Sequence, residues 1–492
     1  MNADWNLIKL RHQVLYEVAK LAFEGTLDEK AEFIPEKIIP GTIPTYRCCV
    51  YKEREIVRQR VRLSLGKAPG PEDDGNLIQV IAPACADCPI SSYLVTENCQ
   101  NCVGKACINS CRFGAITPGK DRSEIDRTKC KECGQCAKAC PYNAIVHLQR
   151  PCKSTCPVDA LTYEEDGLAI INKKKCIQCG ICIHSCPFGA IGVRNAIVPV
   201  IEALKSDRPV YAMIAPATEG QYGKEINLAS WKNAAKALGF VDLYEVGLGA
   251  DLTTAAEAEE WYEAYQRGEK RCTSCCPAFV NMIRRHFPEI QDMVSTAVSP
   301  MCQLSRLIKH EHPDAVTVFI GPCIAKKSEV EDQQLEGNVD YALIYSEFEA
   351  IMRAKEIKFE PSDEKLQEAS TFGKRYANAG GVADSCIEYL KEQGHDEDFS
   401  VLKVSGAREL KKTLGKIRKN GMEEAFMEGM SCEGGCFYGP SSRDSSPKAA
   451  RTRETLIQSA DDRTIHENLE GYDLSYEMHD TTREKEKEGA ES

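Results

Sequence analysis

Apolar residues recur every three or four positions near the start of the chain and form short continuous runs further on. The first pattern predicts an amphipathic helix over residues 7–23. Its apolar face carries Leu7, Leu10, Val14, Val18 and Leu21. Continuous runs at 210–216, 241–246 and 316–320 predict buried strands, with a helix at 227–238 after the first. This alternation is typical of α/β layers built on parallel sheets.

Cysteine-bearing loops stand beside this pattern in three places. They are Thr273–Phe279 (TSCCPAF), Gly321–Glu329 (GPCIAKKSE) and Met430–Cys436 (MSCEGGC). Each places a thiol beside proline or glycine, where the backbone turns and can approach a bulky cofactor. Ligands of parallel α/β folds gather at the carboxyl ends of strands, and these loops are expected there.

The length of 492 residues suggests two to four domains. We expect a helical and charged segment over 1–76, a cysteine-dense region over 77–195, an α/β domain over 196–457 and a polar tail over 458–492. The end of that tail is charge-rich and is expected to be disordered. Residues 68–75, rich in Pro, Gly and Asp, are expected to form a linker.

The composition limits which classes of partner and which cellular compartment we expect. The net charge is −12 and no long basic run occurs, which argues against nucleic acid as the main partner. No apolar stretch reaches the roughly 18 residues that a membrane span needs. Met1–Trp5 does not begin a secretory signal. The 26 cysteines fall mainly in C-x2-C runs, which favours metal binding in a reducing compartment, so we expect a cytoplasmic protein.

Three runs of four cysteines dominate the region 77–195. Two are the bacterial ferredoxin run, C-x2-C-x2-C-x3-C-P, and the third has a longer middle gap. They begin at Cys130, Cys176 and Cys99. In such runs three thiolates hold one [4Fe–4S] cluster and the fourth reaches a neighbouring cluster. Zinc fits less well, because zinc sites do not need the triple run followed by proline.

Pairing the runs uses sixteen cysteines for four clusters. The expected ligand sets are Cys99, Cys102, Cys107 and Cys140; Cys130, Cys133, Cys136 and Cys111; Cys176, Cys179, Cys182 and Cys156; and Cys85, Cys88, Cys152 and Cys186. For Cys85 and Cys88, packing in a turn is the alternative. Cys48, Cys49 and isolated Cys386 are expected to be structural. A chain of clusters is a path for electrons and implies a redox centre at its end.

The three cysteine loops, in this order and preceded by ferredoxin-like modules, resemble those of the [FeFe]-hydrogenases over residues 77–440. The likeness is strongest to a less-studied subgroup with altered loop residues. It implies an α/β catalytic domain of two lobes with parallel sheets, preceded by α+β ferredoxin-like domains. The implied reaction is reversible H2 oxidation and proton reduction. The implied partners are a ferredoxin-type electron carrier and maturation proteins.

The resemblance also implies a cofactor, the H-cluster, and roles for particular residues. Its [4Fe–4S] part would be held by Cys276, Cys323, Cys432 and Cys436, the last also bridging to a two-iron subcluster with CO, cyanide and a bridging dithiolate amine. Pro216 and Lys326 would contact the cofactor, Lys326 as a hydrogen-bond donor to cyanide. The implied proton carriers are Cys275, Glu257, Glu260, Ser299 and Glu329.

Several positions depart from the best-known members of that family. Ala278-Phe279 stands where Gly-Trp is usual, Gly321 where Met is usual, and Ala217 where a serine contacts cyanide. Met301-Cys302 replaces Gln-Gln, and Phe-Tyr-Gly-Pro follows Cys436. No arginine is evident at the outer end of the relay, where Ala264 stands. Cys302 could be a packed thiol or a redox-active one.

Two other functions compete with catalysis. One is a hydrogen sensor on the same cofactor, although no PAS-like, kinase or phosphatase segment is evident at the C-terminus. The other is a non-catalytic iron–sulfur carrier, like the nuclear prelamin recognition factor-like assembly proteins of the same fold. Lys326 and the expected relay residues argue against a carrier.

Overall fold

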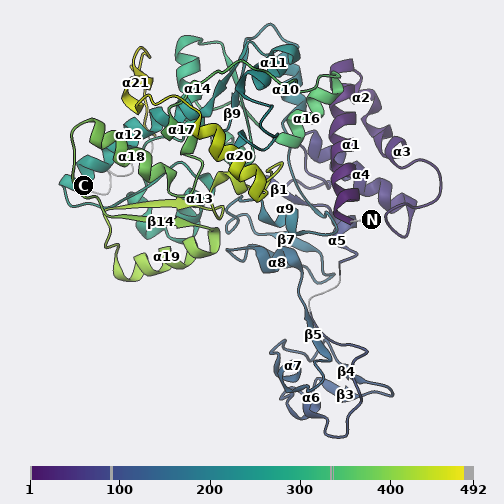
Figure 1. Ribbon diagram of the computed structural model, residues 1–492. Coiled ribbons are helices and arrows are strands. Elements are labelled where there is room, and N and C mark those ends of the chain that lie inside the picture. Colours follow the sequence, from purple (N-terminus) through teal and green to yellow (C-terminus); the bar gives the residue numbers. More distant parts are fainter. Residues whose placement is uncertain (1–2, 89–91, 333–334, 336, 481–492) are drawn as a thin grey trace.

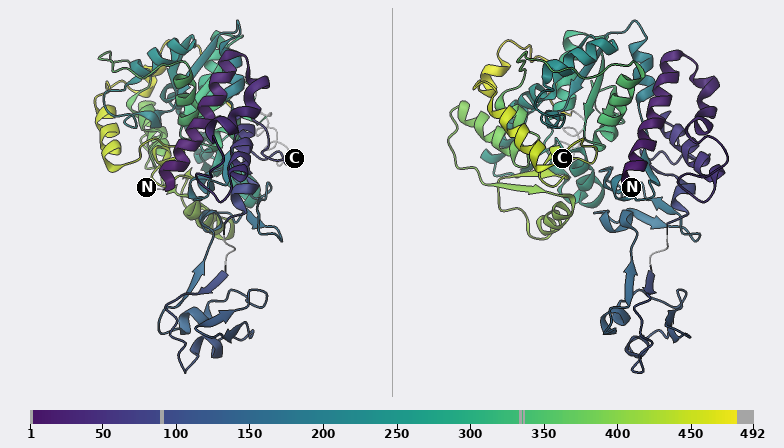
Figure 2. Two further views of the ribbon diagram at one scale, coloured as in Figure 1. Left: turned by 90° about the vertical axis from the view of Figure 1, so that its right-hand side faces the viewer. Right: turned by 45° about the vertical axis from the view of Figure 1, so that its right-hand side comes forward.

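The chain folds into a large body from which one small cysteine-rich unit projects (Figure 1). The computed structural model describes residues 3–88, 92–332, 335 and 337–480. The stretch expected to be disordered at the C-terminus, 481–492, lies outside the described residues. Figure 2 shows the small unit set apart from the body in both views.

The N-terminal segment is helical. Its elements are α1 (Ala3–Glu24), α2 (Leu27–Lys30), η1 (Ala31–Phe33), α3 (Ile34–Ile38) and α4 (Val50–Ser64). The predicted amphipathic helix is therefore confirmed by α1, and its Val14, Val18 and Leu21 are buried against α3 and α4. Residues 65–77, with the predicted linker, contain no helix or strand.

The cysteine-dense region consists of short helices and antiparallel strand pairs. The projecting unit holds β2 (Ser92–Val95), α6 (Ala106–Asn109), β3 (Ile116–Pro118), β4 (Ser123–Ile125), α7 (Gln135–Ala139) and β5 (Ile145–Leu148). The body holds β1 (Ile78–Val80), α5 (Ala82–Cys85), α8 (Pro151–Thr155), β6 (Leu161–Tyr163), β7 (Ala169–Ile171), α9 (Ile181–Ser185) and β8 (Ile191–Val193). The antiparallel pairs are β2–β5, β3–β4, β6–β7 and β1–β8.

Two parallel sheets organise the rest of the body. The first has the order β10-β9-β12-β13, and the second has the order β11-β15-β14. Their strands are β9 (Val210–Ile214), β10 (Asp242–Glu245), β11 (Arg271–Cys272), β12 (Val316–Gly321), β13 (Tyr341–Ile344), β14 (Val401–Ser405) and β15 (Phe426–Met430). The expected class, an α/β domain with parallel sheets after iron–sulfur modules, is confirmed.

Helices enclose these sheets. They are α10 (Ile197–Leu204), η2 (Pro216–Thr218), α11 (Leu228–Leu238), α12 (Val246–Gln266), α13 (Pro277–His286), η3 (Pro288–Met293), α14 (Pro300–Glu311), α15 (Ala325–Val330), α16 (Tyr345–Ala354), α17 (Thr371–Arg375), α18 (Gly381–Glu392), α19 (Ala407–Asn420), η4 (Cys436–Tyr438), α20 (Pro447–Gln458) and α21 (Ile465–Leu469). The predicted helix at 227–238 corresponds to α11.

The first sheet is buried on both faces, which explains its continuous apolar runs. In β9, Tyr211 and Met213 join one apolar cluster, whereas Val210, Ala212 and Ile214 join another. Because successive side chains of a strand point to opposite faces, a strand covered on both sides is apolar throughout.

The polar tail packs on the body over its described part. Ile465 and Leu469 are buried, and Asn468 donates a hydrogen bond to Asp251 at 2.7 Å. Further on, Thr296 and His479 share a hydrogen bond of 2.8 Å. Polar composition alone does not reveal this packing, because a few buried apolar residues and specific hydrogen bonds are enough to hold a segment.

Candidate active site

The three cysteine loops meet at the carboxyl ends of the parallel strands. Pro216 follows β9, Cys323 follows β12, Cys276 follows β11 and Cys432 follows β15. At Gly435, φ is 105°, and a Cβ there would lie 2.4 Å from the carbonyl oxygen of Ala377. Only glycine permits this close approach, which places Cys436 beside the turn after α17.

These loops enclose one cavity of about 90 Å³. Its walls are mostly apolar, and its sulfur-bearing lining consists of Cys179, Cys275, Cys276, Cys323, Cys432, Cys436 and two methionines, Met301 and Met430. Lys326 and Pro216 also line it. The structure therefore brings together the four thiols expected to hold a cluster, the expected proton carrier Cys275 and both expected cofactor contacts.

The donor set fits an iron–sulfur cluster better than a single ion. Among the described residues no three His, Cys, Asp or Glu side chains gather closely enough to hold one metal ion. The four thiols instead surround a cavity, as a cube with four iron corners requires. Burial, followed by neighbouring thiolates, raises the pKa of Cys323 to about 11 and that of Cys436 to about 12. Coordination by iron would offset this cost, because metals bind the thiolate form.

The structure places the members of each expected accessory cysteine set near one another. Cys99, Cys102, Cys107 and Cys140 line one small cavity of the projecting unit, and Cys111, Cys130, Cys133 and Cys136 line another. In the body, Cys176, Cys179 and Cys156 are close enough to raise the pKa of the Cys182 thiol further, after burial. The Cys152 thiol is surrounded in the same way by Cys186, Cys85 and Cys88.

One accessory set reaches the central cavity. Cys179 lines it, and its neighbour Gly180 lies so close to the loop after Cys323 that a Cβ there would stand 2.5 Å from Ile324. Cys182 in turn lies within electrostatic reach of Cys152 in the next set. The cysteine sets of the body therefore form a sequence that ends at the cavity.

Lys326 is the cation of the cavity. Its Nζ donates to Ser299 Oγ at 2.7 Å, to Glu329 Oε2 at 2.7 Å and to the Cys275 carbonyl oxygen at 3.4 Å. Burial acts to lower the pKa of Lys326, but Glu329 together with the Cys323 and Cys275 thiols offsets burial, and the pKa is raised. Lys326 is therefore a fixed positive charge whose longest bond is the one that a ligand can most easily replace.

A second polar group runs from the cavity toward the surface. Glu257 Oε1 accepts from the Ser274 amide at 3.0 Å, and Cys275 lies near enough to feel the Glu257 charge. Ser295 hydrogen-bonds Glu257 and donates to Glu260 Oε2 at 2.7 Å. Arg271 pairs with Glu260 at 3.5 Å and with Glu269, which is partly exposed.

This arrangement differs from the expected relay in three respects. The Ser299 hydroxyl bonds Lys326, and the hydroxyl between the two glutamates belongs to Ser295, four residues earlier. An arginine does stand at the outer end, but it is Arg271, which precedes the first cysteine loop. Tyr376 was not anticipated. It lines the cavity and its hydroxyl donates to Glu257 Oε2 at 3.4 Å.

Glu257 is expected to be protonated at neutral pH. Burial is the main cause that raises its pKa from 4.5 to about 8. Between these values the folded chain keeps a proton that the unfolded chain loses, so the side chain destabilises the fold increasingly as pH rises through this window. Infrared titration should show a carboxylic-acid C=O band that disappears near pH 8 and is missing in Glu257→Gln.

Glu428 provides the matched control for this titration. It is also buried, but two backbone amides partly offset burial and its pKa is raised only to about 6. Glu428→Gln should leave the band that titrates near pH 8 intact. A Glu257-dependent band that is already lost at pH 5 would contradict a protonated Glu257.

One departure from the best-known members of the family, the glycine at position 321, has a steric explanation. A Cβ at this position would lie 2.7 Å from the Phe319 ring and 2.8 Å from Ala215. Phe319 itself lines the cavity. The space that a larger side chain at position 321 would need is therefore occupied from within the same strand. Cys302 is fully buried but is not part of the cavity lining, and burial raises its pKa to about 12.

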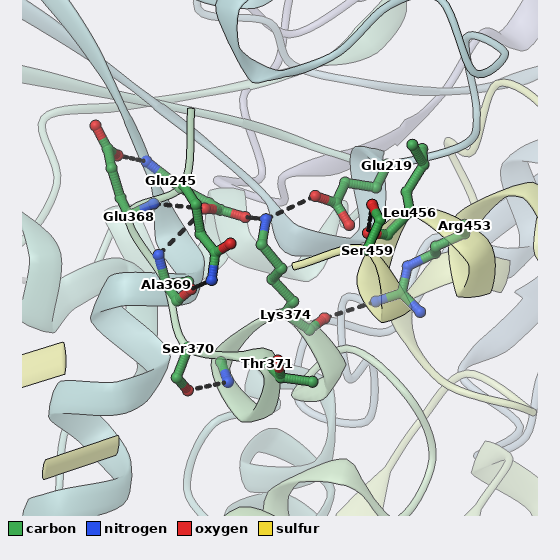
Figure 3. Close-up of polar contacts among 12 residues, drawn as sticks. Glu219, Glu245, Glu368, Ala369, Ser370, Thr371, Lys374, Arg453, Leu456 and Ser459 are labelled. Carbon is green, nitrogen blue, oxygen red and sulfur yellow. Dashed lines mark hydrogen bonds and ion pairs between the residues drawn. The ribbon is translucent and has the colours of Figure 1, made fainter. Parts of the chain in front are cut away.

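A mostly buried polar network is centred on Lys374 (Figure 3). Lys374 Nζ donates to Glu219 at 2.7 Å and to Glu245 at 2.5 Å. Arg453 of α20 donates to the Lys374 carbonyl oxygen at 2.7 Å. Glu219 directly follows η2, whose Pro216 and Ala217 line the cavity. The network thereby joins one wall of the cavity to α17, α20 and the end of β10.

Comparison with known proteins agrees with this geometry. The sequence profile described as "Iron only hydrogenase large subunit, C-terminal domain" matches residues 208–440. Residues 208–440 therefore form a domain of the iron-only hydrogenase family. The family resemblance of the three cysteine loops is confirmed, and the chain is an oxidoreductase of the hydrogenase type. Profiles of a 4Fe-4S binding domain and of the LdpA Fe-S cluster-binding domain match residues 123–146 and 146–197.

Similarity to individual hydrogenases is distant. Iron hydrogenase 1 of Clostridium pasteurianum is 25% identical over 410 residues, which covers 70% of each chain. The NADP-reducing hydrogenase subunit HndD of Solidesulfovibrio fructosivorans is 26% identical over 398 residues, or 69% of this chain and 60% of HndD. A variant of the [FeFe]-hydrogenase HydA1 from Chlamydomonas reinhardtii has a TM-score of 0.49 at 17% identity, over 59% of this chain and 97% of that one. Within the described residues no helix has the length and apolar character to cross a membrane.

Proposed function

We propose that this hydrogenase catalyses the reversible reaction 2H⁺ + 2e⁻ ⇌ H2 and exchanges electrons with a ferredoxin-type carrier. The observation that carries the proposal is the cavity in which four thiols, a buried lysine and a fifth, free thiol converge. A sensor or a carrier of the same fold needs a cofactor site, but it does not need a path for protons from that site to the surface.

Cys276, Cys323, Cys432 and Cys436 would hold the cubane part of the H-cluster, and Cys436 would also bridge to the two-iron subcluster. When bound, this cofactor supplies an iron position for H2 and an amine that exchanges a proton. The chain provides an apolar enclosure, which excludes water and strengthens the few polar contacts inside it.

Lys326 would orient the cofactor by donating a hydrogen bond from Nζ to a cyanide ligand. An ammonium has three donors, and two of them are engaged at 2.7 Å by Ser299 and Glu329. The third makes the 3.4 Å contact with the Cys275 carbonyl and can turn into the cavity. Ser299 and Glu329 would then act by positioning Lys326, in place of the relay role first expected for them.

Protons would pass through Cys275, Glu257, Ser295 and Glu260. Cys275 stands at the cavity, and protonated Glu257 is the next group that can donate or accept. Ser295 joins the two carboxyl groups, and Arg271 holds Glu260 at the outer end. Each step is a transfer between neighbouring oxygen or sulfur atoms, as general acid–base catalysis requires.

The decisive experiment is infrared spectroscopy of anaerobically matured protein. Bands of CO and CN⁻ are expected, together with H2 evolution when a reduced ferredoxin is supplied. If CO and CN⁻ bands are absent although the iron–sulfur clusters are loaded, the two-iron subcluster is not assembled and the proposal fails. Slow turnover with a strong response of a bound partner protein to H2 would instead indicate a sensor.

A further inference from the structure

The helical N-terminal segment contacts one accessory cluster site through arginines. Three side chains from α1, α4 and the loop between α3 and α4 donate hydrogen bonds to the backbone around Cys186. The bonds are Arg11 Nη2 to the Ile183 oxygen at 3.2 Å, Arg47 Nη2 to the Phe188 oxygen at 3.3 Å, and Arg60 Nη2 to the Gly189 oxygen. The guanidinium of Arg47 also lies 4.9 Å from the Phe188 ring centroid.

A fourth arginine lies at the same cysteine set. Arg150 is 4% exposed. Its Nη2 donates to the Cys88 carbonyl oxygen at 3.2 Å, and its Nη1 lies 4.0 Å from Cys85 Sγ. The set Cys85, Cys88, Cys152 and Cys186 is therefore surrounded by four guanidinium groups from four parts of the chain.

Two of these cations have no carboxylate to neutralise them. Across the described part of the chain, Arg11 and Arg60 form no ion pair with Asp or Glu, and the only anionic group that raises the pKa of either is the Cys186 thiolate. Burial lowers the pKa of Arg60 to about 9, so it remains charged at neutral pH. A buried, uncompensated cation is costly unless an anion stands beside it.

We propose that Arg11, Arg47, Arg60 and Arg150 make the cluster on Cys85, Cys88, Cys152 and Cys186 the most easily reduced of the four accessory clusters. The inference rests on the ligand sets of the proposed function. Reduction adds one electron to a cluster that four thiolates already make negative, and no bond or proton changes. Nearby positive charges stabilise the added electron, and they do so most strongly where water is excluded.

The clusters at the other three accessory sites should be harder to reduce. Lys105 and Arg122 lie near Cys99 in the projecting unit, but Cys99 is partly exposed and Cys133 of the neighbouring set is exposed, so solvent and salt screen such charges. At the set that includes Cys176, Arg285 donates to the Cys176 carbonyl oxygen. Lys153, Arg408 and Lys411 line a pocket beside Cys156 of this set. Lys153 and Arg408 are exposed and Lys411 pairs with Asp159, so solvent and this carboxylate weaken their effect.

The position of this cluster site explains what its easy reduction would contribute to the reaction. Cys152 lies within electrostatic reach of Cys182, and Cys179 of that next set lines the active-site cavity. An easily reduced cluster at this site would store one electron, separated from the cavity by a single further cluster site. Because the proposed reaction moves two electrons per H2, such a reserve allows a carrier that delivers one electron at a time to serve it.

The test is an anaerobic redox titration of the full chain with loaded iron–sulfur clusters, followed by electron paramagnetic resonance. In the unaltered protein the first signal to appear should be the one that Cys186→Ser abolishes. Arg60→Gln and Arg11→Gln should lower the midpoint of that signal so that another cluster is reduced first. Arg60→Lys, which keeps the charge and loses the planar donor group, should largely restore the order.

Arg62→Gln is the matched control. Arg62 lies on the same helix and also donates to backbone oxygens, those of Ala68 and Gly70, but not at the cluster loop. It should leave all midpoints unchanged. If Arg60→Gln loses iron, Arg11→Gln provides the same measurement, because Arg11 likewise forms no ion pair with Asp or Glu among the described residues. Unchanged midpoints in the Gln variants, or an equal shift of all clusters, would overturn the proposal.

The titration is independent of H2 turnover. If the CO and CN⁻ bands are missing but the redox titration gives the expected order of reduction, the proposed catalysis is rejected. The proposed effect of the arginines on the cluster then still stands. Conversely, a Cys186→Ser variant that abolishes a late signal would reject this effect while catalysis stands.

Discussion

Replacing Cys275 by serine is expected to lower H2 turnover by about 10²–10⁴-fold, the usual contribution of a positioned acid–base group. Its thiol lines the cavity and lies within electrostatic reach of Glu257, so it is placed to connect the cofactor with the buried carboxyl. A serine hydroxyl is a far weaker acid than a thiol and would interrupt transfer at this point. H2 evolution and the CO and CN⁻ infrared bands should be measured on the same preparation, with the bands retained.

Cys302→Ser is the matched control for this variant. It makes the same chemical change at a fully buried thiol that does not line the cavity, and turnover should change little. Turnover close to normal in Cys275→Ser would contradict the proposed path. Tyr376→Phe would then test the other hydroxyl that lines the cavity and contacts Glu257.

The thiols of the site could be anticipated from the sequence, because cluster ligands are local in sequence. Cys276, Cys323, Cys432 and Cys436 each sit in a tight loop. The apolar run before Cys323 predicted β12, whereas β11 and β15, which precede the other two loops, were not predicted. Parallel strands carry such loops to one edge of a sheet. The accessory sets gather for the same reason, since three of their four thiols come from one short run.

The proton path could not be derived in full, because it depends on contacts between distant segments. Ser295 and Ser299 stand four residues apart in one stretch, and the backbone direction there decides that Ser295 meets Glu260 and Ser299 meets Lys326. Arg271 reaches Glu260 because it lies on β11, which pairs with β15 from much later in the chain. Sequence spacing carries no signal for either contact.

The N-terminal segment shows the same limit. The apolar spacing of its first helix predicted α1, but the sequence showed only that the segment is charged and gave no role for its arginines. Their role depends on carbonyl oxygens more than a hundred residues away, as in the contact from Arg60 to Gly189. Helix periodicity shows which face is buried, whereas it does not show which partner a charged residue meets.

Replacing Lys374 by methionine should destabilise the α/β body by about 3–5 kcal/mol, the cost of removing one partner from a buried ion pair. Its side chain is 5% exposed and serves two carboxylates, Glu245 at 4% exposed and Glu219 at 25% exposed. Methionine fills similar space but leaves both acids without their cation. Thermal and denaturant unfolding of the cluster-loaded protein under anaerobic conditions would measure the loss.

Two comparisons separate this buried pairing from an ordinary salt bridge. Lys403→Met breaks the pair with Asp384, whose side chains are 41% and 59% exposed, and should cost about 0–1 kcal/mol. Adding Glu219→Gln to Lys374→Met should recover part of the stability, because one of the two unpaired charges is removed. Since Glu219 follows the loop that carries Pro216 into the cavity, the single variant should also perturb the CO and CN⁻ bands. A stability loss no larger than that of Lys403→Met would mean that water reaches the network and that it does not brace the cavity wall.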